Sequence, residues 1–142
     1  MAVVKDGRTQ ASDQVRRHFD EAVMNPERLD EIRGMLADDY VHVDRRSVVG
    51  LPDLDGAGFI ESLRIGHEAG LDSFDRQLVA RLGDRLFLSH VKTRFTDGSE
   101  KQYLVLNQWD RNVAKVEQSV RFDPDDLDAA TAELDRLYAE LD

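Results

Sequence analysis

The chain has 142 residues and no cysteine, so it holds one ordinary domain without disulfides or thiolate metal ligands. Its formal net charge of −10 repels phosphate backbones and anionic membranes, which argues against nucleic acid as a partner. The longest unbroken apolar run, residues 103–106, is too short for a membrane span or a signal-peptide core, so we expect a cytoplasmic protein with no membrane partner.

The first half of the chain predicts helices. An apolar residue recurs every four positions behind Ser12, a candidate N-cap, which predicts a helix over 11–24. Residues 1–10 lack such a period and are expected to be flexible. A second helix is predicted over about 25–36, with a proline in its first turn, and a third over about 54–68.

A short strand is predicted over 40–44, between the second and third helices, because the apolar period changes there to two. Tyr40, His42 and Asp44 then share one face of the strand, and the two valines between them share the other. The polar face is the first candidate for chemistry in this chain.

The second half predicts an antiparallel meander followed by a helix. Four segments rich in β-formers are separated by short turns with residues that tolerate the left-handed region. These segments lie at about 74–82, 85–95, 101–110 and 113–122. Asp123 as N-cap and Pro124 at the first helical position predict a C-terminal helix over 123–142, with an apolar stripe that packs on the same domain.

The strand over 101–110 carries a candidate pocket wall. Tyr103, Val105, Asn107 and Trp109 share one face, and an amide among apolar and aromatic neighbours suits a pocket. A tryptophan at such a position also suits a core or a dimer interface. Gln118, on the next strand, is a further candidate polar group.

Two short runs carry a resemblance to a known superfamily. Residues 36–44, Leu-Ala-Asp-Asp-Tyr-Val-His-Val-Asp, resemble the F-A-D-D-x-x-x-x-D run that leads into the first strand of ketosteroid isomerases and SnoaL-like proteins. Residues 54–56, before the third helix, are similar to the helix entry of SnoaL-like proteins. With the element order, the chain resembles the nuclear transport factor 2-like superfamily over 15–122.

The resemblance implies an α+β, cone-shaped fold. Three N-terminal helices would pack on a curved antiparallel sheet, and residues 11–122 would form the SnoaL-like domain. The helix over 123–142 would be an addition, because many members stop at the sheet.

The same resemblance implies a set of catalytic positions. In the isomerases the last aspartate of the run is the general base, and Asp44 matches it here. The positions of their oxyanion tyrosine and aspartic acid match His18 and Asn107. From the residues themselves, His42 shares the face of Asp44 and could share or relay the proton. Two alternatives stay open from the residues themselves: Asp44 could form a salt bridge at the strand end, and His42 could be a structural histidine. No cofactor is implied, and His42 with Asp44 are too few ligands for a metal.

These observations predict a small, largely apolar ligand in the cone pocket, with possible isomerase, cyclase or dehydratase chemistry next to a carbonyl. The expected contacts are Tyr40, Tyr103, Val105, Trp109, Gln118, Phe59 and Leu63. The alternative is a non-catalytic homodimerisation or ligand-sensing module, because alternating strands leave four leucines in need of cover. These are Leu86, Leu88, Leu104 and Leu106. The C-terminal helix could provide that cover instead, and a homodimer is expected for either function.

Overall fold

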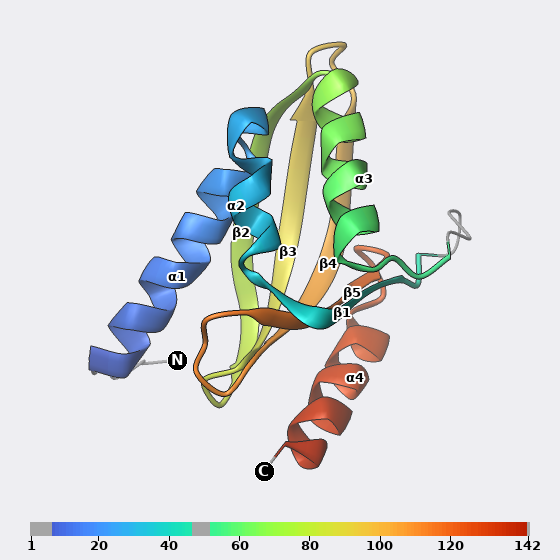
Figure 1. Cartoon of the computed structure of the whole chain (residues 1–142). Coiled ribbons are helices and arrows are strands. Elements are labelled where there is room, and N and C mark those ends of the chain that lie inside the picture. The colour runs from blue at the N-terminus through green and yellow to red at the C-terminus, as the bar shows by residue number, and fades with distance from the viewer. Residues whose placement is uncertain (1–6, 47–51, 142) are drawn as a thin grey trace.

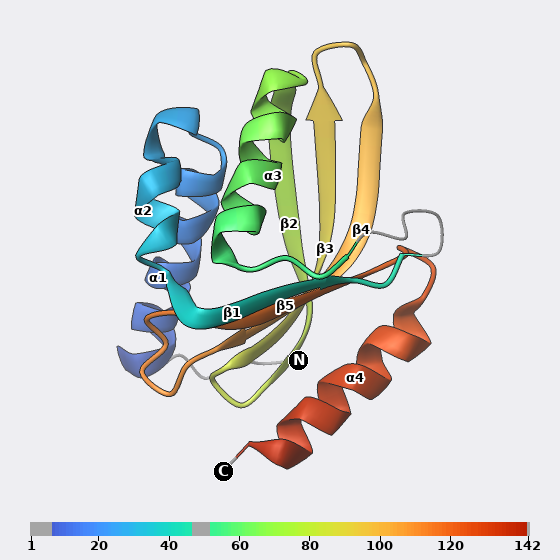
Figure 2. The ribbon, with the colours of Figure 1, turned by 45° about the vertical axis from the view of Figure 1, so that its right-hand side comes forward.

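The computed structural model describes residues 7–46 and 52–141, the side chains of 7–12 excepted. The predicted flexibility of residues 1–6 and part of the loop before the third helix therefore lie outside the described residues. Three helices lie on one side of a curved five-stranded sheet and the fourth lies on the other (Figures 1 and 2). We call the side with the three helices the inner face and the side with the fourth the outer face.

Helix α1 (Gly7–Val23) begins earlier than predicted. Residues 7–10 are helical rather than flexible, and Ser12 lies inside the helix instead of capping it. This first turn contains Arg8 and Gln10, which have good helix propensity and can extend a helix without an apolar period. The apolar spacing therefore marked only the part of α1 that packs on the domain.

The second predicted helix is shorter than its apolar stripe. A 3-10 turn, η1 (Pro26–Arg28), leads into α2 (Leu29–Arg33), and the side chain of Asn25 accepts a hydrogen bond of 3.0 Å at the start of η1. Leu36 begins a strand instead of ending the helix. Its partner is Val116, whose amide donates to the carbonyl of Met35 over 2.8 Å.

The sheet is mixed, which corrects the prediction of a wholly antiparallel one. Its strands are β1 (Leu36–Asp44), β2 (Leu71–Leu82), β3 (Leu86–Phe95), β4 (Glu100–Trp109) and β5 (Val116–Phe122), in the order β1-β5-β4-β3-β2. The meander β2 to β5 is antiparallel as predicted, but β1 pairs with β5 in parallel. No hairpin joins β1 to β5, so turn geometry does not fix their direction.

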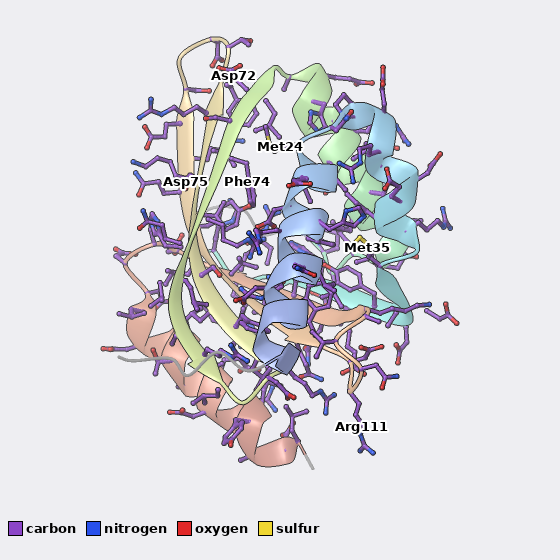
Figure 3. All side chains as sticks on the ribbon, turned by 90° about the vertical axis from the view of Figure 1, so that its left-hand side faces the viewer. Met24, Met35, Asp72, Phe74, Asp75 and Arg111 are labelled. Atoms are coloured by element: carbon purple, nitrogen blue, oxygen red, sulfur yellow. The ribbon has the colours of Figure 1, made fainter. Side chains whose placement is uncertain are left out.

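The main core lies between the inner face and the first three helices. Phe19 of α1 meets Trp109 of β4 edge to face, with 5.9 Å between the ring centroids. On β2, Phe74 points into this core and its neighbour Asp75 points away from it (Figure 3). Helix α3 (Gly56–Glu68) is capped by Asp55, whose carboxylate accepts from the amide of Gly58 over 2.8 Å.

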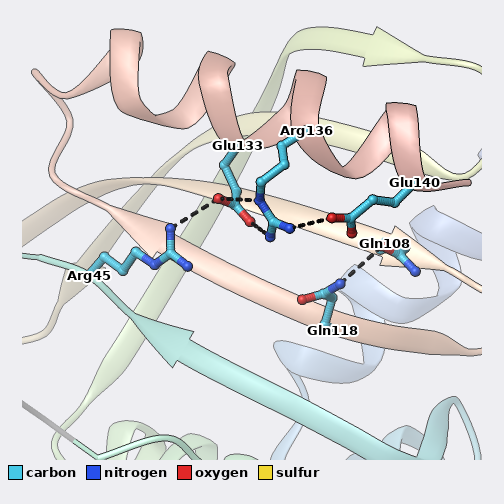
Figure 4. Close-up of polar contacts among 6 residues, drawn as sticks. All are labelled: Arg45, Gln108, Gln118, Glu133, Arg136 and Glu140. Carbon is cyan, nitrogen blue, oxygen red and sulfur yellow. Dashed lines mark hydrogen bonds and ion pairs between the residues drawn. The ribbon is translucent and has the colours of Figure 1, made fainter.

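Helix α4 (Leu127–Glu140) covers the outer face (Figure 2). It begins at Leu127, so the prediction that Asp123 caps it is wrong; Asp126 occupies that position and its side chain makes no capping bond. An ion pair also links α4 to the end of β1, because Glu133 pairs with Arg45 over 3.1 Å; Glu133 pairs in addition with Arg136 on its own helix (Figure 4).

Under α4 lie the four leucines that suggested self-association. Leu86, Leu88 and Leu106 have no exposed surface, and Leu104 is 3% exposed. Their cover is therefore intramolecular, and they give no support to an association surface. The homodimer itself stays a prediction. None of the helices in the described part of the chain has the length and apolar character needed to cross a membrane.

Candidate active site

A narrow cavity of about 30 Å³ lies between the inner face and helices α1 and α3. By volume it holds about two water molecules. Its apolar walls are formed by Phe19, Val23, Phe59, Leu63, Phe74, Tyr103 and Val105. Its polar groups come from His42, Arg76, Asn107, Ser119 and Arg121. A further void of about 10 Å³ lies beside Asn107 and Trp109.

An outer cavity of about 170 Å³ continues from the narrow one. The two cavities share part of their lining: Val23, Leu63, Phe74, Tyr103 and Arg121. The outer cavity extends towards the end of the sheet at which β3 turns into β4 (Figure 1), where Phe95 and Lys101 line it. The interior is therefore stepped, with a small polar end and a larger outer part.

A chain of hydrogen bonds links the polar groups of the narrow cavity. The Tyr40 hydroxyl donates to Oγ of Ser119 over 2.9 Å, and Ser119 donates in turn to Oδ1 of Asn107 over 2.7 Å. The Tyr40 oxygen also lies 3.3 Å from Nδ1 of His42. Because the only hydroxyl hydrogen of Tyr40 is already donated, this contact requires Nδ1 to carry the hydrogen.

The direction of these hydrogen bonds determines which donor and acceptor atoms of His42 and Asn107 remain for the cavity. With Nδ1 protonated and the ring neutral, Nε2 of His42 carries a lone pair and accepts hydrogen bonds. With Oδ1 of Asn107 occupied, its NH₂ group remains as a donor. His42 therefore offers the cavity an acceptor and Asn107 offers it a donor, beside the guanidinium donors of Arg76 and Arg121.

Burial keeps His42 neutral. Its ring stacks on Phe59 with 5.1 Å between centroids and only 5% of the residue is exposed. Burial and, second to it, the positive charge of Arg121 lower the pKa of His42 to about 3. Burial also raises the pKa of the Tyr40 phenol, which stays protonated and able to donate.

The carboxylate of Asp44 forms an ion pair with an arginine and does not line the cavity. Its carboxylate accepts from Arg46 at Nε over 2.9 Å and at Nη2 over 2.5 Å, and from the Arg46 amide over 3.1 Å. Burial alone would raise the pKa of Asp44, but the hydrogen bonds and charge of Arg46 outweigh burial and lower it. Asp44 lines neither cavity. This geometry favours the salt bridge that the sequence left open.

We expect Asp44→Asn to lower the free energy of unfolding at pH 7 by about 1–3 kcal/mol, because the variant loses charged hydrogen bonds to Arg46. The folded-state pKa of Asp44 lies below the usual 3.8, so its contribution is present above that value and is lost as the pH falls through the folded pKa. Urea unfolding of both proteins at pH 7 and in acid measures this difference. Asp39→Asn, an exposed change on β1, is the control. Equal stability of wild type and Asp44→Asn at pH 7 would contradict the ion-pair role.

Comparison with known proteins adds to this geometry. No family model matches the sequence, and no curated protein does either. Among solved structures, BvnE pinacolase from Penicillium brevicompactum superposes with a TM-score of 0.63 at 15% identity, over 96% of this chain and 99% of that one. An NTF2-like protein from Cytophaga hutchinsonii gives 0.59 at 12% identity, over 84% and 99%.

A SnoaL-like protein from Shewanella denitrificans gives a TM-score of 0.58 at 14% identity, over 87% of this chain and 98% of that one. The chain has the nuclear transport factor 2-like fold. At these identities the similarity concerns the fold alone. The predicted cone architecture is confirmed, with a mixed sheet in place of an antiparallel one.

Within this nuclear transport factor 2-like cone, most of the predicted ligand contacts come together. His42, Phe59, Leu63, Tyr103, Val105 and Asn107 line the narrow cavity, and Trp109 lines the void beside it. Tyr40 lies behind His42 and reaches the cavity through the hydrogen-bond chain. The roles of these residues in binding or catalysis stay predictions.

Two predicted pocket residues lie elsewhere, because neither His18 nor Gln118 lines either cavity. The side chain of His18 is half exposed on α1, with Nδ1 3.3 Å from Arg28 and Nε2 3.6 Å from Glu31. Gln118 donates to Gln108 over 3.0 Å on the outer face, near α4 (Figure 4). His18 lies beside the apolar stripe of its helix, and Gln118 points to the opposite face from Ser119.

Four residues in and around the cavities were not predicted from the sequence. Ser119 and Arg121 share the inner face of β5, and Arg76 of β2 pairs with Asp20 of α1 over 3.1 Å. Burial raises the pKa of Asp20, and the charge and hydrogen bond of Arg76 partly offset this. The alternation of Ser119 and Arg121 with apolar residues was a usable signal for β5. Asp20 and Arg76 are 56 positions apart, and only the fold joins them.

Within residues 7–46 and 52–141, no group of three or more histidine or acidic side chains is arranged to hold a metal ion. The arrangement found instead is a neutral imidazole and an amide that line the same cavity. Such a pair can accept a proton and donate a hydrogen bond to a carbonyl oxygen.

Proposed function

We propose that this protein binds a small, largely apolar carbonyl compound in the cone cavity and moves a proton next to its carbonyl group. The observation that carries the proposal is the hydrogen-bond chain from His42 to Asn107, which leaves an acceptor and a donor facing the same cavity. The likeness in fold to BvnE pinacolase supports an enzymatic role for such a cavity.

In this mechanism Nε2 of His42 takes a proton from the carbon beside the carbonyl. The NH₂ group of Asn107 donates to the carbonyl oxygen and stabilises the negative charge that develops there. The resulting enolate is reprotonated by His42 at the same or another carbon, which gives exchange or isomerisation. The reacting end of the ligand lies in the narrow cavity and its body in the outer one.

The low pKa of His42 is compatible with this step. Burial and the positive charge of Arg121 lower the pKa of His42. An enolate beside the ring offsets the charge of Arg121 and so favours the imidazolium. His42 therefore becomes a stronger base as the enolate forms. Asp44, held by Arg46, is not used as the base in this proposal.

Proton exchange of 2-tetralone in D₂O tests the proposal without knowledge of the natural substrate. This ketone is apolar and has acidic hydrogens at C1, and NMR follows their replacement by deuterium. We expect wild-type protein to accelerate the exchange and His42→Ala to lower the rate by about 100-fold or more. The control is His90→Ala, a half-buried histidine on the outer face. Equal rates for wild type and His42→Ala would contradict the proposal.

A further inference from the structure

The two cavities are lined by cations and by no carboxylate, although the chain as a whole carries a net charge of −10. Arg76 and Arg121 line the narrow cavity, and Arg46, Lys101 and Arg121 line the outer one. Arg46 and Arg76 each have a carboxylate partner outside this lining, so its unbalanced positive charge comes from Arg121 and Lys101. Such a lining attracts an anionic group of a ligand.

The partners of these cations differ. Arg46 is neutralised by Asp44 over 2.5 Å, and Arg76 by Asp20 over 3.1 Å. Among the residues that the structure describes, no carboxylate lies within ion-pair distance of Arg121. Its guanidinium stacks on the Tyr103 ring at 4.3 Å, and its Nε is buried without a hydrogen-bond partner. Arg121 is therefore a charged group of the cavity lining that has no carboxylate partner among the described residues, and a ligand can supply one.

Arg121 also has the right position for such a ligand group. It is one of the residues shared by the narrow and the outer cavity, so it stands where they join. Apolar side chains of Val23, Leu63 and Phe74 are shared with it. The guanidinium presents a planar set of donors that matches a carboxylate.

We propose that the ligand of this cavity is a carboxylate with an apolar body, and that its carboxylate pairs with Arg121. Lys101, which lines the outer cavity and has no ion pair with a described residue, adds attraction along the way in. This inference rests on the proposed function, because it assumes that the cone cavity binds a small molecule. Beyond the proposed function, it states that the ligand is anionic and that Arg121 recognises its carboxylate.

Isothermal titration with 2-naphthoate and with the neutral 2-naphthamide tests the inference. The two probes share an apolar body and differ in charge. We expect wild-type protein to bind the carboxylate at least about tenfold more tightly than the carboxamide. Arg121→Gln should remove that preference and leave the affinity for the carboxamide within about twofold of the wild-type value. The retained carboxamide binding would also show that the variant is folded. Arg121→Lys should restore part of the preference, since it restores the charge.

The matched control is Arg64→Gln on α3, whose side chain is 49% exposed and pairs with Glu61. It changes the net charge as Arg121→Gln does, but away from both cavities. If wild type binds both probes equally, or if Arg121→Gln weakens both alike, the inference is overturned while the cavity remains a binding site. If neither probe binds wild type, the binding proposal itself fails, and the inference with it.

Discussion

Lowering the pH from 6.5 to 4.5 is expected to destabilise the wild-type protein more steeply than a His42→Asn variant, by a difference in slope approaching about 1.4 kcal/mol per pH unit. The pKa of His42 is about 3 in the folded protein, against 6.5 for an ordinary histidine. Between these values the unfolded chain holds a proton at this position that the folded chain lacks. Stability therefore falls as the pH falls, and His42→Asn removes this contribution.

Chemical denaturation at several pH values measures this difference. Other groups also titrate as the pH falls, among them Asp20, whose pKa burial raises, but they are common to both proteins and cancel in the comparison. His90→Asn is the control, because it removes a histidine from the outer face and leaves His42 in place. Parallel stability curves for wild type and His42→Asn would show that His42 is not held neutral by burial.

Truncating Leu134 to alanine is expected to lower the free energy of unfolding by about 2–5 kcal/mol. Leu134 is 2% exposed and belongs to the cluster in which α4 packs on the outer face. Its neighbours include Leu88 and Leu106, which have no exposed surface, so truncation leaves a cavity that rigid strands do not fill.

Leu127→Ala is the matched control for this experiment. The residue begins the same helix but is 44% exposed, so the same truncation should change stability by no more than about 0.5 kcal/mol. Urea denaturation of the three proteins gives the comparison. Equal effects of the two changes would contradict the packing of α4 on the sheet.

The elements that could be predicted from the sequence are those with a local signal. Alternation located the antiparallel meander, whose short turns fix the direction of each following strand. The parallel pairing of β1 with β5 had no such signal, because the pairing joins distant segments. Leu36 fits the helical stripe equally well, and only its bond pattern with β5 makes it a strand residue.

The site follows the same division. Alternation within one strand correctly grouped Asn107 with Tyr103 and Val105, and it placed His42 beside Tyr40. Which face of β5 lines the cavity could not be read from that strand alone, so Gln118 was chosen in place of Ser119. The family pattern favoured Asp44 as a base, but the neighbouring Arg46 engages it.

The central claim is that His42 and Asn107 act on the same carbonyl group. The most direct test is the rate of 2-tetralone deuterium exchange in wild type, His42→Ala, Asn107→Leu and the double variant. We predict that each single change lowers the rate by about 100-fold, and that the double variant is far less impaired than the product of the two losses, because the residues work as a unit. An Asn107→Leu variant as fast as wild type, or multiplying losses in the double variant, would contradict the claim.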